Sequence, residues 1–400
     1  MSDKKFDKLR VSVLALGHMV NDSYSNVVPP LLPLLQAAYG LTYTLSGLIM
    51  TVFTFTSSII QPVFGYFADR YGRRWMVALS VLWIAFFMSM IGIVGYLGLD
   101  PTGSYIVILA LVGMAGFGSS AYHPQASAMV PRISGDHKGF GVSVFSAGGN
   151  LGYAIMPLLV VPVTAIWGLG GVMLLFIPGL LMAFVLQRYA PEAPVAAVQP
   201  AIRELWQDIR SVALPLTKVI GVVTMRAWLF FGLITFLPSY LIQYESQEWA
   251  SMALSLMLVC GAAGTLLGGT MSDRYGRKFT IVSTLMLTGP LLLCALLTHD
   301  LLQLGFFALA GLALLASFSP AVLIAQGLIP KNQGMASGII LGFAIGIGGL
   351  GVSVTGAIAD ATSISIGMLS LVLLPIAAFL IALLLPGNVR PEKAGVRIAK

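Results

Sequence analysis

Long apolar stretches separated by short charged segments constrain this chain more than any other feature of its sequence. Across residues 11–68 the only titratable side chains apart from tyrosine are His18 and Asp22. That stretch can hold two spans of about 20 apolar residues, the length at which a helix crosses a bilayer. The pattern repeats to the end of a chain that is 58% hydrophobic. We therefore expect an all-α membrane protein in contact with the lipid bilayer.

Twelve transmembrane helices are predicted when the apolar runs are divided at turn residues and charges. A barrel is excluded because the runs are continuous and do not alternate. The expected helices cover approximately residues 11–38, 44–68, 75–98, 104–131, 139–162, 166–187, 213–241, 249–271, 279–298, 301–328, 334–359 and 363–385.

The positions of the cations predict the orientation, because short loops rich in Lys and Arg stay cytoplasmic. With the N-terminus inside, all of the 22 Lys and Arg residues except Arg226 fall in predicted cytoplasmic segments. Both termini are therefore expected to be cytoplasmic. The net charge of +7 is explained by this topology, so no nucleic-acid partner is expected.

A charged decapeptide occurs twice, as GYFADRYGRR at residues 65–74 and as GTMSDRYGRK at residues 269–278. The two copies lie about half the chain apart, each after the second helix of its own set of six, which indicates an internal repeat. The longest polar segment lies between the two sets. We therefore predict an N-terminal six-helix bundle over residues 1–187, a cytoplasmic linker over 188–212 and a C-terminal bundle over 213–400.

Each copy of the decapeptide is expected to take part in gating. Gly65 and Gly269 would let a helix end approach its neighbour closely, while Asp69 and Asp273 would form charge pairs or cap a helix N-terminus across the two halves. Such contacts would hold the cytoplasmic side shut. The candidate gating residues are Gly65, Asp69, Arg70, Gly72, Arg73, Arg74, Arg132, Gly269, Asp273, Arg274, Gly276 and Arg277.

The repeated G-x-x-x-D-R-x-G-R-R loop, together with the arrangement of six plus six spans, resembles the major facilitator superfamily over the whole chain. This resemblance implies two six-helix bundles around a central cavity lined mainly by helices 1, 4, 7 and 10. It also implies that helices 2, 5, 8 and 11 form the moving interface.

Three further segments resemble the fosmidomycin-resistance efflux proteins: GHMVNDSYSNVVPPLLPLLQ, GFGSSAYHPQASAMV and GMASGIILGFAIGIGGLGVSVTGAIAD. His18, Asn21 and Asp22 match the first-helix motif of that family, and His123 with Pro124 matches its H-P motif. Those proteins tend to continue with a glutamate and, a turn later, an arginine. This chain has Gln125 and Ala128 instead.

A few polar residues fall where lipid makes them costly, since a charge at the bilayer centre costs about 2.5 to 3.5 kcal/mol. His18 and Asp22 are four residues apart and share a helix face. Counted from the nearest cytoplasmic cation, Asp22 lies roughly 18 Å deep, His123 roughly 14 Å and Arg226 roughly 12 Å. If helices 1, 4 and 7 line one cavity, these four side chains converge on one polar site.

In such a site a carboxylate can take up and release a proton, so Asp22, His18 and His123 are the candidate proton-coupling residues. Arg226 would either compete for the carboxylate or bind an anionic group of the substrate. The candidate substrate-binding residues are Asn21, Tyr24, Gln125, Arg226, Trp228, Phe230 and Gln326.

Together these features predict a proton-driven antiporter that exports a small drug-like or phosphonate-like compound. The alternatives are a proton-coupled symporter that imports a small organic anion or metabolite, and a receptor or scaffold that transports nothing. One carboxylate can also serve sodium, although the histidine neighbours favour the proton. The expected setting is the bacterial cytoplasmic membrane, and the expected state is a monomer.

No enzyme motif, phosphate-binding loop or metal-ligand spacing is present in the sequence. Cys260 and Cys294 lie inside predicted spans and match neither a disulfide framework nor a metal pattern. We therefore expect no enzymatic activity, no cofactor and no metal.

Overall fold

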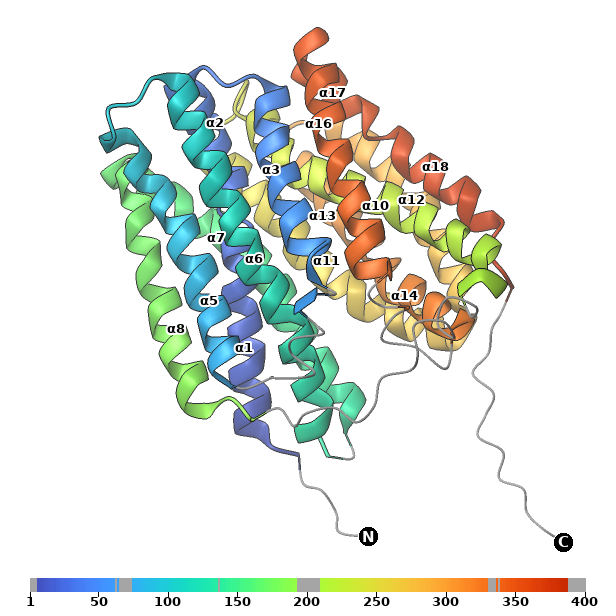
Figure 1. The fold of residues 1–400 in the computed structure, drawn as a ribbon. Helices are drawn as coiled ribbons and strands as arrows, with labels where there is room; N and C mark the ends of the chain where they lie inside the picture. Colours follow the sequence, from blue (N-terminus) through green and yellow to red (C-terminus); the bar gives the residue numbers. More distant parts are fainter. Residues whose placement is uncertain are drawn as a thin grey trace, which may run out of the picture.

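The structure is a computed structural model that describes residues 6–61, 63–64, 74–135, 137–192, 209–329, 336 and 339–387. Every regular element in this part of the chain is helical (Figure 1). The elements are α1 (Lys8–Ser25), α2 (Val28–Tyr39), α3 (Tyr43–Ser58), α5 (Arg74–Ser89), η1 (Met90–Tyr96), α6 (Pro101–Ile133), α7 (Lys138–Trp167), η2 (Leu169–Leu175), α8 (Phe176–Tyr189), α10 (Ala213–Leu241), α11 (Gln247–Tyr275), α12 (Arg277–Leu297), α13 (Asp300–Ala316), α14 (Phe318–Leu328), the π-helical η4 (Ile339–Ala344), α16 (Ile345–Ala361), α17 (Ile364–Ser370) and α18 (Leu373–Leu383).

Ten helical segments of the described chain are long and apolar enough to cross a membrane. The all-helical membrane character expected from the sequence is confirmed. The first two expected spans are not among the ten: the segment expected over 11–38 is divided into α1 and α2, and α3 ends at Ser58. A total of twelve spans therefore stays a prediction.

Proline explains why several expected helices are divided. A proline ring clashes with the carbonyl four residues earlier and removes one backbone hydrogen bond. The residue four positions before Pro29 is Ser25, where α1 ends. The residue four positions before Pro320 is Ala316, where α13 ends and α14 follows. Pro375 has the same effect between α17 and α18. The spans expected over 301–328 and 363–385 are each present as one segment able to cross a membrane, Asp300–Leu328 and Ile364–Leu383, with a break in the helix inside it.

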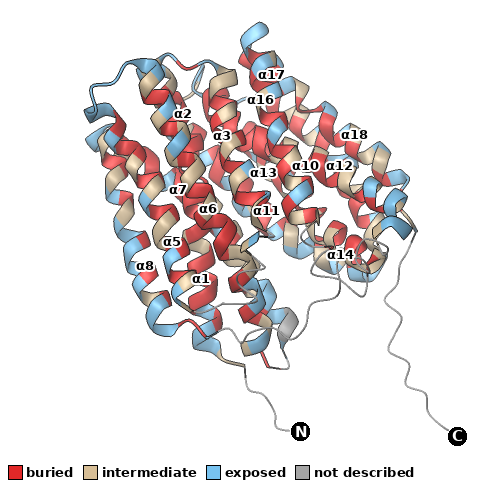
Figure 2. Ribbon diagram, viewed as in Figure 1, coloured by how far each residue is buried: buried red, intermediate tan, exposed pale blue. Residues whose placement is uncertain are grey.

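The outward surfaces of the helices are apolar, as a lipid environment requires. Figure 2 shows exposed residues along the outer side of α8, while buried residues face the interior of the molecule. Phe184 on α8 and Leu301 on α13 are 72% and 75% exposed. Large apolar side chains left open on this scale favour contact with lipid over water.

Helices α3 and α16, far apart in sequence, lie side by side and join the two groups of helices (Figure 1). Their backbones approach closely: a β-carbon placed on Gly47 would lie 2.9 Å from the carbonyl oxygen of Val352. The hydroxyl of Thr51 donates to the carbonyl of Gly349 at 2.9 Å. Small residues on both helices permit this contact.

Asp360, in the last turn of α16, adds polar contacts between α16 and the start of α3. Its two carboxylate oxygens accept hydrogen bonds from the backbone N–H groups of Tyr43 and Thr44, at 2.7 and 2.8 Å. These donors belong to the first residues of α3, where helical N–H groups have no intrahelical partner. A carboxylate at this position also complements the helix dipole.

The boundary between the two predicted bundles falls at a long connection. Helix α8 ends at Tyr189 and α10 begins at Ala213. Most of the predicted linker lies outside the described residues, so the division of the chain into 1–187, 188–212 and 213–400 stays a prediction.

Candidate functional site

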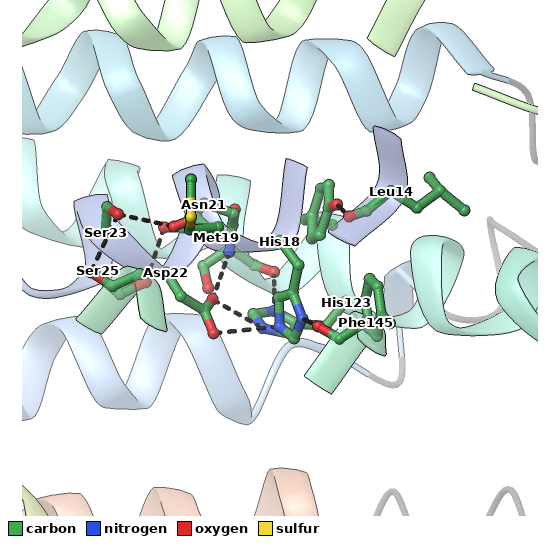
Figure 3. A network of polar contacts seen from close by, with 12 residues as sticks. Leu14, His18, Met19, Asn21, Asp22, Ser23, Ser25, His123 and Phe145 are labelled. Atoms are coloured by element: carbon green, nitrogen blue, oxygen red, sulfur yellow. Dashed lines mark hydrogen bonds and ion pairs between the residues drawn. The ribbon is translucent and has the colours of Figure 1, made fainter. Parts of the chain in front are cut away.

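Three of the predicted residues meet at the centre of the N-terminal group of helices (Figure 3). The Nε2 atom of His18 lies 3.2 Å from one carboxylate oxygen of Asp22, and the Nε2 atom of His123 lies 3.2 Å from the other. His18 and Asp22 come from α1 at a spacing of four residues, and His123 comes from α6. We call these three side chains the His–Asp–His triad.

The other ring nitrogen of each histidine is fixed by a backbone carbonyl. Nδ1 of His18 lies 2.8 Å from the carbonyl oxygen of Phe145 on α7, and Nδ1 of His123 lies 2.8 Å from that of Ser119. A carbonyl can only accept, so each Nδ1 carries a hydrogen and donates it. This assignment leaves each Nε2 facing Asp22, where it forms a hydrogen bond only if the ring holds a second proton.

Asp22 is nearly enclosed, whereas His123 is more open. The side chains of Asp22 and His18 are 9% and 10% exposed, and that of His123 is 29% exposed. The side-chain amide of Asn21 donates a hydrogen bond to the carboxylate, at 3.0 Å. Among the described residues, the carboxylate of Asp22 therefore has polar contacts only with His18, His123 and Asn21.

Glycines of α7 bring that helix against the triad. Gly148 and Gly152 contact the backbone carbonyls of Ala15 and Met19 on α1. Between them, a β-carbon on Gly149 would lie 2.5 Å from Cε1 of His18 and 2.6 Å from a carboxylate oxygen of Asp22. Gly149 therefore forms one wall of the site. Gly149 was not among the site residues predicted from the sequence.

The triad is also the one group within the described residues whose side chains could share a larger cation. Its nitrogen and oxygen atoms all lie within 4.8 Å of one another. Two imidazoles and one carboxylate suit a proton well and sodium poorly, because sodium, a hard cation, prefers oxygen ligands.

Arg226 does not join the triad, although the sequence predicted that it would. Both residues are described, and no ion pair forms between Arg226 and Asp22. The guanidinium instead lies over the ring of Phe318, 4.6 Å from its centre, and is 4% exposed. An isolated buried cation costs several kcal/mol, and a ring contact returns only about 0.5 to 2 kcal/mol.

Among the predicted substrate-binding residues, several side chains make structural contacts. The Tyr24 hydroxyl donates to the backbone carbonyl of Leu175 and the side chain is 1% exposed, so it packs between helices. The amide of Gln125 donates to Ala121 at 3.1 Å within its own helix. These two side chains are buried in this arrangement, and their role in substrate binding stays a prediction.

The remaining predicted substrate-binding residues lie on α10 and α14. The indole of Trp228 donates to Thr355 at 2.9 Å, which ties α10 to α16. Phe230 lies edge-on to Tyr153 of α7, with ring centres 6.0 Å apart. Gln326 lies half-buried in α14.

The first copy of the decapeptide lies almost entirely outside the described residues, including Gly65, Asp69, Arg70, Gly72 and Arg73. Arg74, its last residue, pairs with Glu192 just after α8. Arg132 is exposed in the last turn of α6. The gating role of this first copy stays a prediction.

The second copy forms the turn between α11 and α12. Gly276 has φ of 99°, a conformation that favours glycine, and Arg277 donates to the carbonyl of Leu323 on α14 at 2.9 Å. Asp273 is exposed and makes no ion pair with a described residue, and its role in a latch across the halves stays a prediction. Arg274 lies over the ring of Tyr275.

The expectation for Gly269 was wrong. A β-carbon at this position would have no neighbour within 4 Å. The close approach is made by Gly264 and Gly268, which contact the carbonyls of Leu312 and Ala316 on α13. The reason is helical periodicity, because residues four apart share a face and Gly269 points away from it.

Comparison with known proteins identifies the family. The model of the Major Facilitator Superfamily matches residues 14–264 and 245–399. The chain belongs to the Major Facilitator Superfamily. It is 31% identical to the fosmidomycin resistance protein of Escherichia coli over 94% of this chain and 93% of that protein.

Other relatives agree with this membership. The chain is also 31% identical to an uncharacterised transporter of the superfamily from Bacillus subtilis, over 94% of this chain and 92% of that one. A bacterial homologue of the human lysosomal transporter Spinster, solved in an inward-facing and occupied conformation, has the same fold with a TM-score of 0.79. That structure is 16% identical and covers 95% of this chain and 96% of its own.

Proposed function

We propose that this protein is a secondary active transporter, a proton-coupled antiporter that exports a small drug-like or phosphonate-like compound by alternating access. One observation supports the proton coupling above all others. Two histidine Nε2 atoms contact the two oxygens of Asp22 at 3.2 Å, while both Nδ1 hydrogens are already donated to backbone carbonyls. Each contact therefore becomes a hydrogen bond only when a proton arrives.

The difference in exposure suggests an order of proton transfer. His123 is the most open member of the triad, so it exchanges protons with the solvent first. Asp22, between the two rings, passes the proton on to His18, which contacts its other carboxylate oxygen. Imidazole suits this role because its unperturbed pKa lies close to physiological pH.

The charge of the triad links protons to conformational change. With both rings neutral the triad carries a net charge of −1 from Asp22 and lies inside an apolar bundle, which is unfavourable. One added proton makes the triad neutral. The protonated form therefore returns between the two sides more readily than the empty form, and the compound is carried on the opposite step.

The family and the apolar surface support a membrane setting. We infer that the protein resides in the bacterial cytoplasmic membrane as a monomer, with both termini in the cytoplasm. No step of the proposed cycle requires a cofactor or a second copy.

The test uses the full-length protein in proteoliposomes with a pH-sensitive dye inside. Vesicles loaded with fosmidomycin are diluted into drug-free buffer. Exit of the drug through an antiporter carries protons inward, so the interior should become more acidic. Asp22→Asn should abolish this change. Asp100→Asn, which removes a carboxylate that caps α6 through Gly103, is the matched control and should retain it.

A wild-type pH change in the Asp22→Asn vesicles would contradict the assignment of the coupling site. If the drug leaves wild-type vesicles without any change of the internal pH, proton coupling itself would be contradicted.

Import of a small organic anion with protons is the second candidate. The unpaired guanidinium of Arg226 suits an anionic compound whichever way it moves. The same experiment separates the two directions of coupling, because a symporter would make the vesicle interior more alkaline as the compound leaves. A receptor or scaffold would release no drug at all.

A further inference from the structure

Arg226 is a buried cation without a counter-ion. Its Nε atom is fully buried and has no hydrogen-bond partner. The guanidinium makes no hydrogen bond or ion pair with any residue that the structure describes, and it lies over the ring of Phe318. The edge of a guanidinium, where its N–H donors lie, is the part that binds oxygen atoms.

The helices around Arg226 offer no acid to balance its charge. Helix α10 contains no Asp or Glu, and neither do its neighbours α14 and η4. The acids on the other helices that contact α10 are engaged or distant: Asp360 binds the first residues of α3, Glu248 lies in the first turn of α11, and Asp273 is exposed in its last turn. Asp22 is held by the two histidines.

The backbone around Arg226 is held in place by contacts on both sides. Thr224 donates to the carbonyl of Ala344 in the π-helical segment η4, at 3.2 Å. Trp228 donates to Thr355 at 2.9 Å. Single-turn π-helical segments occur frequently at functional sites. Arg226 therefore lies on a segment of α10 that is held in place, and this segment contacts the π-helical segment η4.

We propose that Arg226 binds an anionic group of the transported compound, either a phosphonate, a sulfonate or a carboxylate. This inference rests on the proposed transport function and adds the residue that recognises the anionic group of the substrate. The planar guanidinium presents paired donors that match two oxygens of one such group. Phe318 contacts the guanidinium through its ring, and no described residue accepts a hydrogen bond from the guanidinium Nε.

A lipid headgroup can present the same kind of anionic group as a transported compound, so the test has two arms. Full-length protein in dodecyl maltoside, which contains no phosphate, is titrated with methylphosphonate at constant ionic strength. Thermal unfolding is followed by intrinsic fluorescence, because a ligand that binds the folded state raises the unfolding temperature in proportion to its occupancy. The second arm repeats the titration with phosphatidylglycerol present.

Wild-type protein should be stabilised in a saturable manner. Arg226→Gln should weaken the apparent affinity about 10- to 100-fold, the loss expected for hydrogen bonds to a charged group. Arg226→Lys keeps the charge but loses the paired N–H donors of the guanidinium, so its apparent affinity should lie between those of the wild type and Arg226→Gln. Arg188→Gln, which removes an exposed arginine lying over Tyr189, is the matched control and should respond like the wild type.

An Arg226→Gln protein that responds like the wild type would overturn the proposal. Should that variant not fold, an unchanged affinity in Arg226→Lys would do the same. Loss of the wild-type response when phosphatidylglycerol is present would assign the anion to a lipid and overturn the substrate site. The assay needs no proton gradient, so its failure is distinct from a failure of the proposed coupling.

Discussion

Asp360 provides the clearest test of how the two halves are held together. It accepts two backbone hydrogen bonds, at 2.7 and 2.8 Å, from the first turn of a helix in the other half. Substitution by Asn keeps the shape of the side chain but removes the charge and offers one acceptor oxygen in place of two. We expect Asp360→Asn to weaken the contact between α3 and α16 and to lower the population of this arrangement.

The size of the effect follows from the contacts. Hydrogen bonds to a charged group contribute about 1.5 to 3 kcal/mol, and a charge at a helix N-terminus contributes about 0.3 to 1 kcal/mol. Asp360 is exposed, which lowers both contributions. A net loss of about 1 to 2 kcal/mol would change the ratio between molecules with the α3–α16 contact closed and molecules with it open by about 5- to 30-fold.

The measurement is the distance between two spin labels placed near this contact. Exposed Leu99, before α6, and exposed Ile366, on α17, are suitable label positions, after the free cysteines Cys260 and Cys294 have been replaced by serine. Asp360→Asn should add a population with a longer distance between the labels.

The control is Asp100→Asn. Asp100 also caps a helix N-terminus, through the N–H of Gly103 at 3.1 Å, but within its own half. It should leave the distance distribution unchanged. Equal shifts in both variants, or no shift in Asp360→Asn, would refute the idea that this carboxylate holds the halves together.

Two further variants test the interior of the N-terminal helices. Gly149→Ala places a methyl group about 1 Å too close to His18 and Asp22. A displacement of this size can cost about 100-fold in rate, so proton movement in vesicles should nearly stop, while Gly305→Ala, with no neighbour within 4 Å, should transport normally. Equal rates in both would remove Gly149 from the site. Tyr24→Phe leaves the Leu175 carbonyl without its partner and should lower the free energy of unfolding by about 1 to 3 kcal/mol, seen in thermal unfolding. Transport per folded molecule should be unaffected. A selective loss of transport would indicate that Tyr24 also takes part in substrate binding.

Much of the site was predictable because helical spacing is local. The four-residue step from His18 to Asp22 indicates a shared face, and the depth of His123 matches that of Asp22, so their meeting followed once the helices were placed together. Arg226 was misplaced by the same reasoning. Depth along a helix says how far a residue lies from the membrane surface, but the rotation of α10 decides which neighbours it meets, and here it directs Arg226 toward Phe318.

The sequence by itself determined the membrane class, the helical architecture and the internal repeat, because lipid forces backbone groups to pair within each segment and makes every polar residue conspicuous. Only the tertiary structure decided that Gly149 closes the triad, that Asp360 caps a helix of the other half, and that Gly268 rather than Gly269 makes the close contact. These features depend on the relative rotation and approach of helices far apart in sequence, which helical spacing within one segment does not specify.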